Sequence, residues 1–233
     1  MYRVSAYQTL ANTRRKRGDL LGALLDAWTA FDLLTPDDPR RNEVLISMAE
    51  TALEIGDADA ALRAFTQVLE HSLSLRVQVA AATGVLRARL LRSVRFQSSM
   101  TAPHAASPAL TIEASVRPAP VAEATDALTR SMGRVESLLT REAAPRERAY
   151  MLLTLADGAR CIGEIERART FARSAAELAD SYGFHDYVFR ADELLAQLTV
   201  ASAAVAAEES PDPVRGRVLA HAALVRLRAL TTR

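Results

Sequence analysis

The sequence has one cysteine, one lysine and few aromatic residues. Its single cysteine, its low net charge and its lack of a long apolar run restrict the classes of protein to which it can belong. With Cys161 alone, no disulfide framework supports the fold, which suits a reducing compartment. A net charge of +1 gives no strong field toward nucleic acid or membrane. No apolar run approaches the ~18 residues that a membrane span requires. We therefore expect a cytoplasmic protein without a membrane anchor.

Signatures of catalysis and of ligand chemistry are missing as well. The histidines show no metal-ligand spacing with one another, with Cys161 or with carboxylates; they are His71, His104, His185 and His221. No Gly-rich phosphate loop or G-x-S-x-G elbow is present. Gly84 and Gly133 stand singly inside helical patterns, which is typical of packing contacts. The chain is therefore not expected to be an enzyme or to bind a metal or cofactor.

Alanine, leucine and arginine dominate the composition and favour helix at most positions. Within it a short pattern recurs. Gly18-Asp19 and Gly56-Asp57 stand 38 residues apart, and Gly163-Glu164 follows after a further 107, close to three such intervals. Apolar and small residues flank these pairs at similar distances: Tyr7, Leu10, Ala11, Ala23, Leu24 and Ala27 in the first copy; Leu45, Met48, Ala49, Ala61, Leu62 and Phe65 in the second; and Leu152, Leu155, Ala156, Ala159, Ala168, Ala172 and Ala175 in the third.

Each copy is interpreted as two helices joined at the Gly-Asp corner. Glycine adopts the left-handed conformation that ends the first helix without a Cβ penalty. Aspartate accepts hydrogen bonds from the free N–H groups that open the second helix. Small residues such as Ala11 and Ala23 allow the two helices to approach closely, and larger ones such as Phe65 fill the space between pairs.

The pattern resembles the tetratricopeptide repeat (TPR) family, in which a bulky residue, a leucine and a small residue precede Gly-Asp, and Ala-x3-Phe and then Pro follow. Residues 49–65, "AETALEIGDADAALRAF", match it well, with Ala61 and Phe65 at the family's spacing. Pro36 closes the first copy one residue late. The family's late aromatic in the first helix is Arg14 in the first copy and Ala52 in the second, so the repeats are degenerate.

The resemblance covers residues 5–72 and 148–180. It implies an all-α fold, a right-handed α-solenoid of about five antiparallel helix pairs forming a TPR-like superhelix.

Apolar periodicity extends the assignment to the rest of the chain. Stripes predict helices over 75–92 and 121–141, which we interpret as one pair separated by a long insertion. The fourth pair spans 146–182. A fifth begins after Gly183 and ends with a helix over 214–229.

Residues 93–120 hold four of the nine prolines and no period, and are expected to form a flexible loop or linker. The predicted organisation is thus N-terminal TPR-like repeats over 1–92, a Pro/Ser/Ala-rich insertion over 93–120, and C-terminal TPR-like repeats with a capping helix over 121–233.

The first 18 residues are basic and carry no acidic residue before Asp19, which resembles an organelle transit peptide. However, Tyr7, Leu10 and Ala11 keep the register of the repeat. A structural helix is the favoured interpretation.

The useful surface of such a solenoid is its concave face, built mostly from first helices. The repeat register places these residues outward on it: Gln8, Asn12, Arg15 and Lys16 in the first pair; Glu43, Ile46, Glu50 and Glu54 in the second; and Tyr150, Leu153, Asp157 and Arg160 in the fourth. The groove is expected to begin basic and turn acidic. Ordinary solvated helix faces are the alternative for any one of them.

Chaperone-binding members of the family clamp a C-terminal carboxylate with Lys, Asn and Arg. Asn12 stands where the first clamp Asn would lie, but Gln8 replaces the Lys, and Glu50 occupies a second Asn position and would repel a carboxylate. A chaperone adaptor of that kind is not expected.

The function that these observations favour is a bacterial, cytoplasmic protein–protein interaction scaffold that binds a peptide or helix of a partner in the groove. A sensor or adaptor part of a bacterial regulatory system is a close variant. The alternative from another class is an RNA-binding helical-repeat protein, supported by Arg87, Arg89, Arg92 and Arg95. Against nucleic acid stand the acidic second copy and the near-zero net charge.

Overall fold

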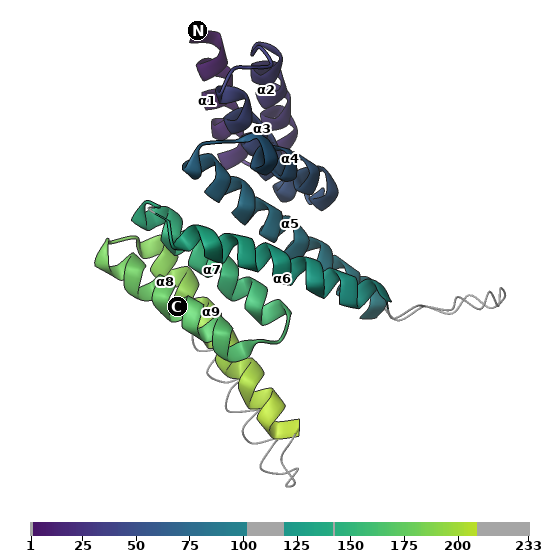
Figure 1. Ribbon diagram of the computed structural model, residues 1–233, viewed down its shortest axis with the longest axis vertical. Coiled ribbons are helices and arrows are strands. Elements are labelled where there is room, and N and C mark those ends of the chain that lie inside the picture. The colour runs from purple at the N-terminus through teal and green to yellow at the C-terminus, as the bar shows by residue number, and fades with distance from the viewer. Residues whose placement is uncertain (1, 102–118, 142, 209–233) are drawn as a thin grey trace, which may run out of the picture. The chain divides into compact units, whose positions relative to one another are not determined.

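The computed structural model describes residues 2–101, 119–141 and 143–208, and the regular structure in these ranges is α-helical throughout (Figure 1). The helices are α1 (Tyr2–Lys16), α2 (Leu20–Asp32), α3 (Arg40–Ile55), α4 (Ala58–His71), α5 (Leu75–Thr101), α6 (Ala119–Leu139), α7 (Pro145–Cys161), α8 (Ile165–Ser181) and α9 (His185–Glu208). The chain divides into two compact units, residues 1–138 (unit 1) and 139–233 (unit 2).

Unit 1 consists of successive helix pairs. Helix α1 packs against α2 and α3 against α4, while α2 also contacts α3, and α4 contacts α5. The first helices α1 and α3 touch, as do α3 and α5. Arg89 of α5 donates hydrogen bonds to two groups of α6. One acceptor is the Ala127 carbonyl, and the other is Ser131 Oγ at a distance of 2.5 Å. The expected pairing of α5 with α6 across the long insertion is therefore present.

Unit 2 repeats the same arrangement. Helices α7 and α8 form a pair, α8 contacts α9, and the two first helices α7 and α9 touch. The described chain thus contains four helix pairs and the first helix of a fifth. The last predicted helix, over 214–229, lies outside the described residues.

The glycine corners are formed as the sequence predicts, whereas the acidic side chain caps the next helix at Asp19 and Asp57 but not at Glu164. Gly18, Gly56, Gly163 and Gly183 have φ of 81°, 92°, 83° and 70°, in the left-handed region that favours glycine. At each corner the N–H after the glycine returns to a carbonyl five residues back, as Asp57 does to Ala52 at 2.8 Å. Asp57 Oδ1 then accepts from the Ala60 N–H at 2.9 Å, which caps α4.

Small residues line the contacts within the pairs. Ala11 and Ala23 are buried, and so are Ala49 and Ala61. Helices α4 and α5 approach so closely that a Cβ added to Gly84 would lie 2.4 Å from the Phe65 ring.

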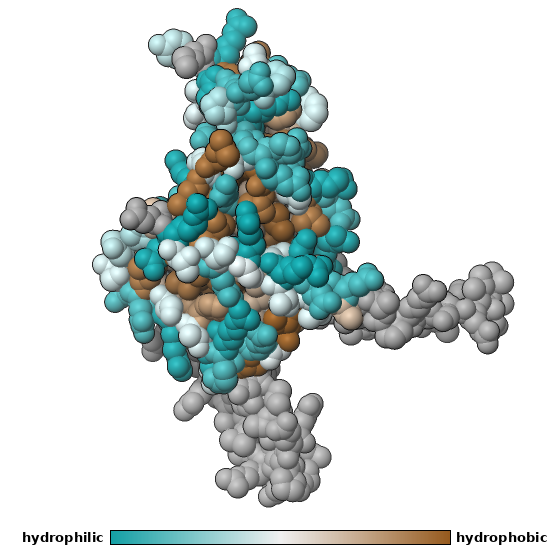
Figure 2. All heavy atoms as spheres, viewed as in Figure 1, coloured by the Kyte–Doolittle hydropathy of each residue, from teal (hydrophilic) through white to brown (hydrophobic). Residues whose placement is uncertain are grey.

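On the face in Figure 2, hydrophilic residues form most of the surface and hydrophobic ones appear in patches between them.

The two isolated helical glycines therefore differ. Gly84 is a packing contact, as expected. Gly133 is exposed in α6, and a Cβ there would meet nothing within 4 Å, so its interpretation as a packing contact is wrong.

The boundaries of the expected insertion also require correction. Helix α5 continues to Thr101, and α6 begins at Ala119, so 93–101 and 119–120 are helical rather than loop. Loss of the apolar period does not end a helix without a breaking residue, and the first proline after Ser93 is Pro103. Residues 102–118, on which the rest of that prediction falls, lie outside the described residues.

The N-terminal segment forms the structural helix that the register favours. Val4 and Ala11 of α1 are buried, and α1 packs along α2. No helix in the described ranges is both long and apolar enough to cross a membrane.

Candidate functional site

The polar face of α1 and α3 carries the first eight candidate residues, and the structure corrects its expected electrostatics. Arg15 forms a hydrogen-bonded ion pair with Glu50 and a second ion pair with Glu54, whose Oε1 lies 3.7 Å from Arg15 Nη1. The basic end and the acidic end of the predicted groove are thus bound to each other. They touch because α1 and α3 are neighbouring first helices, so Arg15, Glu50 and Glu54 do not offer separate sites to acidic and basic partners.

The other candidates in unit 1 have mixed exposure. Asn12, Lys16 and Glu43 are exposed, and Gln8 is half-buried. Ile46 is half-buried because it packs against the clusters around Phe65 and Val68. Arg15 neutralises only one of its two glutamates, so one negative charge remains there, and Lys16 and Glu43 make no ion pair with a described residue.

Unit 2 requires a second correction. Leu153 is fully buried, in a cluster with Ala175 of α8 and Ala191 of α9. A residue at this position faces the neighbouring helices rather than a groove, so Leu153 is not available to a partner. Tyr150 and Asp157 are half-buried and Arg160 is exposed.

An aromatic contact joins α7 to α9. The rings of Tyr150 and Tyr187 stack with centroids 6.3 Å apart, and Phe184 meets Tyr187 edge-on at 6.3 Å. Arg146 lies over the Tyr187 ring at 5.5 Å. Tyr187 is not among the candidate residues that the repeat register predicts. A signal was present: Tyr187 follows Tyr150 by 37 residues, close to the repeat length.

Three arginines on the two helices that carry the aromatic contact, α7 and α9, share two carboxylates. Asp157 lies 3.6 Å from Arg160 and 3.3 Å from Arg190, and Asp186 lies 3.4 Å from Arg146. The side-chain interaction with Tyr187 and the charge of Asp186 raise the pKa of Arg146. The set therefore carries one positive charge more than it neutralises, and every arginine in it stays charged at neutral pH.

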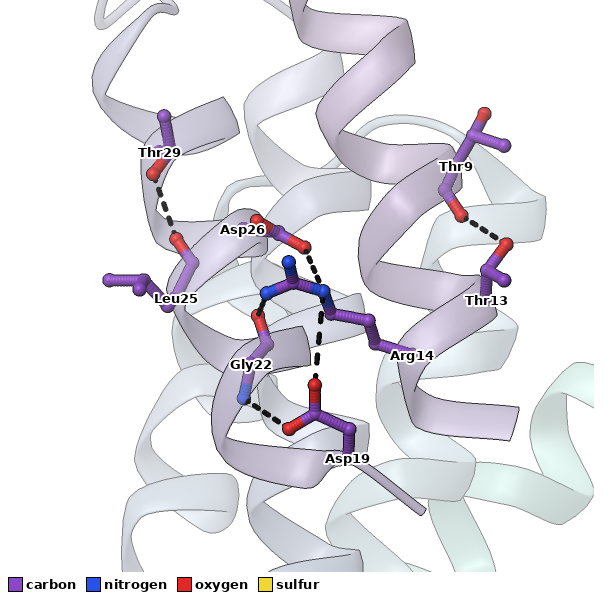
Figure 3. A network of polar contacts seen from close by, with 8 residues as sticks. All are labelled: Thr9, Thr13, Arg14, Asp19, Gly22, Leu25, Asp26 and Thr29. Carbon is purple, nitrogen blue, oxygen red and sulfur yellow. Dashed lines mark hydrogen bonds and ion pairs between the residues drawn. The ribbon is translucent and has the colours of Figure 1, made fainter. Parts of the chain in front are cut away.

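A network of charged side chains joins α1 to α2 (Figure 3). Arg14 Nε lies 3.2 Å from Asp26 Oδ2 and 3.8 Å from Asp19 Oδ2, and Arg14 Nη1 donates to the Gly22 carbonyl at 3.4 Å. Asp26 is buried. Arg14 stands where the TPR pattern has an aromatic residue, so this departure from the pattern replaces an apolar contact with an ion pair to a buried carboxylate.

Two observations concern metal binding and thiol chemistry in the described part of the chain. No group of three or more His, Cys, Asp or Glu side chains there is arranged to hold a metal ion. Burial raises the pKa of the Cys161 thiol, which disfavours the reactive thiolate.

Comparison with known proteins identifies this architecture. No protein-family model and no curated protein matches the chain. Among solved structures it is similar to the crystal structure of a thermophilic TPR protein in Thermus thermophilus, with a TM-score of 0.60 over 95% of this chain and 99% of that one. This chain has a TPR-like helical-repeat fold. At 17% identity the likeness concerns the fold alone. It confirms the all-α helical-repeat solenoid that the Gly-Asp corners predict.

In a TPR-like fold the first helices are α1, α3 and α5 in unit 1 and α7 and α9 in unit 2. The residues around the tyrosine pair come from α7 and α9 or from the Tyr182–Phe184 turn just before α9. The candidate surface that combines aromatic rings, guanidinium groups and a carboxylate is called the α7–α9 face below. It is defined by Arg146, Tyr150, Asp157, Arg160, Tyr187 and Arg190.

Proposed function

We propose that this chain is a protein-interaction scaffold and that a peptide or helix of its partner binds the α7–α9 face. The observation that carries the proposal is the stacked pair of Tyr150 and Tyr187 on two helices whose three arginines share only two carboxylates. Tyrosine and arginine are the residues enriched at the energetic centres of protein interfaces.

The chemistry of the face defines the partner segment. Asp157 neutralises only one of the two guanidinium groups next to it, Arg160 and Arg190. A carboxylate of the partner would form charge-assisted hydrogen bonds with the other. An apolar or aromatic side chain next to that carboxylate would pack on the exposed parts of Tyr150 and Tyr187. The expected partner segment is thus acidic and apolar together.

The corresponding face of unit 1 is a weaker candidate because its arginine is already held by two carboxylates. Arg15 is held by Glu50 and Glu54, and a partner would have to break those pairs before it gained any of its own. The RNA alternative is also weakened. Arg89 is bound to α6, and Arg92 lies 3.2 Å from Asp59 of α4.

The test compares two arginine variants on different faces of unit 2. Arg190→Ala removes a guanidinium from the α7–α9 face. Arg173→Ala removes one from an exposed position of α8, where no ion pair forms with a described residue. Partners captured from the native host with the wild-type chain are identified by mass spectrometry. Isothermal titration then measures the affinity of each variant for the partner.

Arg190→Ala, and separately Tyr187→Ala, should weaken binding about tenfold or more, which corresponds to about 1.4 kcal/mol, and Arg173→Ala should have no effect. Equal affinities for all variants would move the site off this face. A captured complex that nuclease treatment dissolves would favour the RNA alternative instead. The identity of the partner decides whether the scaffold serves a bacterial regulatory system.

A further inference from the structure

Helix α2 carries an apolar stripe on the side that faces away from its neighbours. Leu21, Leu25 and Trp28 are 75%, 65% and 52% exposed. Their spacing of four and three residues places them on one side of the helix. The opposite side packs on α1 and α3, and its alanines are fully buried: Ala23, Ala27 and Ala30. A helix on the outside of a repeat array normally shows polar residues on this side, so the stripe indicates a surface that another molecule covers.

Unpaired charges stand at both ends of the stripe, with opposite signs. Lys16 and Arg17 lie just before α2, and Asp32 and Asp37 lie at and beyond its end; all four are exposed. None of them makes an ion pair with a residue that the structure describes. The aspartates that do pair near these ends are Asp19, with Arg14, and Asp38, with Arg40.

The positions of these residues are symmetric in the sequence, with Leu21, Trp28 and Asp32 on α2 and Arg17 in the corner just before it. The sequence midpoint between Leu21 and Trp28 falls between residues 24 and 25. The midpoint between Arg17 and Asp32 falls at the same place. A two-fold axis through this point turns the stripe onto itself with the helix direction reversed, and it exchanges the basic end for the acidic end.

We propose that α2 is the centre of a homodimer interface, in which the α2 helices of two copies pack antiparallel across a two-fold axis near Leu25. Leu21 of one copy then packs beside Trp28 of the other, and the two Leu25 side chains meet at the axis. Arg17 of each copy lies opposite Asp32 of the other, and Lys16 lies near Asp37. An isologous interface requires a patch complementary to itself, and this charge arrangement meets that requirement.

The first test measures association with a matched pair of variants. Leu25→Arg places two cations at the proposed axis, whereas Leu73→Arg makes the same change at a leucine that is 98% exposed in the short loop before α5. Sedimentation equilibrium should show a monomer–dimer equilibrium for the wild type and for Leu73→Arg. Leu25→Arg should be monomeric at the same concentrations with an unchanged circular dichroism spectrum. Trp28 is the only tryptophan, so its emission should shift to the red when the wild-type dimer is diluted to monomer.

A charge exchange separates a second copy from any other occupant. Arg17→Asp and Asp32→Arg should each weaken the dimer about three- to tenfold, because each repulsive contact occurs twice across the axis. The double variant should restore the wild-type dissociation constant, since the two exchanged charges then face each other across the axis with opposite signs. Rescue of this kind requires that Arg17 of one copy meets Asp32 of another copy.

Three outcomes would overturn the proposal. A wild-type chain that stays monomeric up to about 1 mM would leave the stripe to a different protein. A dimer that Leu25→Arg leaves intact would place the interface elsewhere. A double charge variant no tighter than the single ones would exclude the antiparallel register. None of these results bears on the α7–α9 face, which lies in unit 2 and is tested separately.

Discussion

At the residue scale, two glycines in similar sequence settings have opposite roles. Gly84 of α5 lies against the Phe65 ring, and Gly133 of α6 lies in open space. Both interrupt a helical pattern with a residue of poor helix propensity, so periodicity alone cannot distinguish them. The difference arises from the distance to the helix on the other side, which a single sequence does not contain.

The same substitution at these two positions should therefore act in opposite directions. Gly84→Ala should lower the free energy of unfolding by about 1–3 kcal/mol, because the new methyl group forces α4 and α5 apart. Gly133→Ala should raise it by about 0.4–1 kcal/mol through helix propensity and unfolded-state entropy. Urea titration of both variants measures the difference. A neutral Gly84→Ala would show that the Phe65 ring moves aside without cost.

The second corner supports a further residue-scale prediction. Gly56→Ala should destabilise the chain by about 1 kcal/mol or more, because φ of 92° disfavours any side chain. Asp57→Ala should cost about 0.5–2 kcal/mol through loss of the hydrogen bond to the Ala60 N–H. Asp57→Asn keeps an oxygen acceptor and should recover most of the loss in the same denaturation experiment. If Asn fails to recover it, the cap acts through its charge and not through the hydrogen bond.

At the element scale, the sequence predicts helices well where a residue ends them. The Gly-Asp corners mark the ends of α1 and α3, and the predicted conformation of Gly18 and Gly56 is confirmed. The predicted end of α5 is nine residues too early, because the apolar stripe stops while nothing before Pro103 breaks the helix. Periodicity reports which side of a helix is buried, whereas breakers report where it stops.

The candidate site is less predictable because it depends on pairs of elements. Repeat register assigns Arg15 and Glu50 to one face correctly, but it cannot show that they meet. It also treats Leu153 as outward, although α9 covers that side of α7. The contacts that decide such cases, such as Tyr150 with Tyr187, join residues about one repeat apart. Such contacts become visible only when the neighbouring first helices are placed side by side in the structure.

The contact between α1 and α3 gives a prediction at this scale. A double-mutant cycle with Arg15→Ala and Glu50→Ala should give a coupling energy of about 0.2–1 kcal/mol that decreases with salt. The matched cycle with Lys16→Ala and Glu50→Ala should give a coupling near zero, since Lys16 makes no ion pair with a described residue. Coupling of Glu50 to Lys16 instead would mean that the observed ion pair is exchanged in solution and that Arg15 remains free for a partner.

At the scale of the whole molecule, the division into two units raises the question of cooperativity. In a helical-repeat protein each repeat stabilises its neighbours, and stability is a sum of local terms rather than one global core. The chain carries one natural probe in each unit. Trp28 is the only tryptophan and lies in unit 1, and Cys161 is the only cysteine and lies in unit 2.

These probes allow the last prediction. Unfolding of unit 1 should shift Trp28 emission, because α2 loses its contacts with α1 and α3. Unfolding of unit 2 should expose the Cys161 thiol, whose raised pKa and partial burial keep it slow to react in the folded chain. Gly56→Ala should lower the urea midpoint of the Trp28 transition and change the midpoint of Cys161 labelling less, because the corner at Gly56 belongs to unit 1.

Gly163→Ala, at a corner with φ of 83° in unit 2, is the reciprocal control and should act mainly on the midpoint of Cys161 labelling. If each substitution moves both midpoints equally, the chain unfolds in one step. The boundary near residue 138 would then separate clusters of contacts but not independently stable parts.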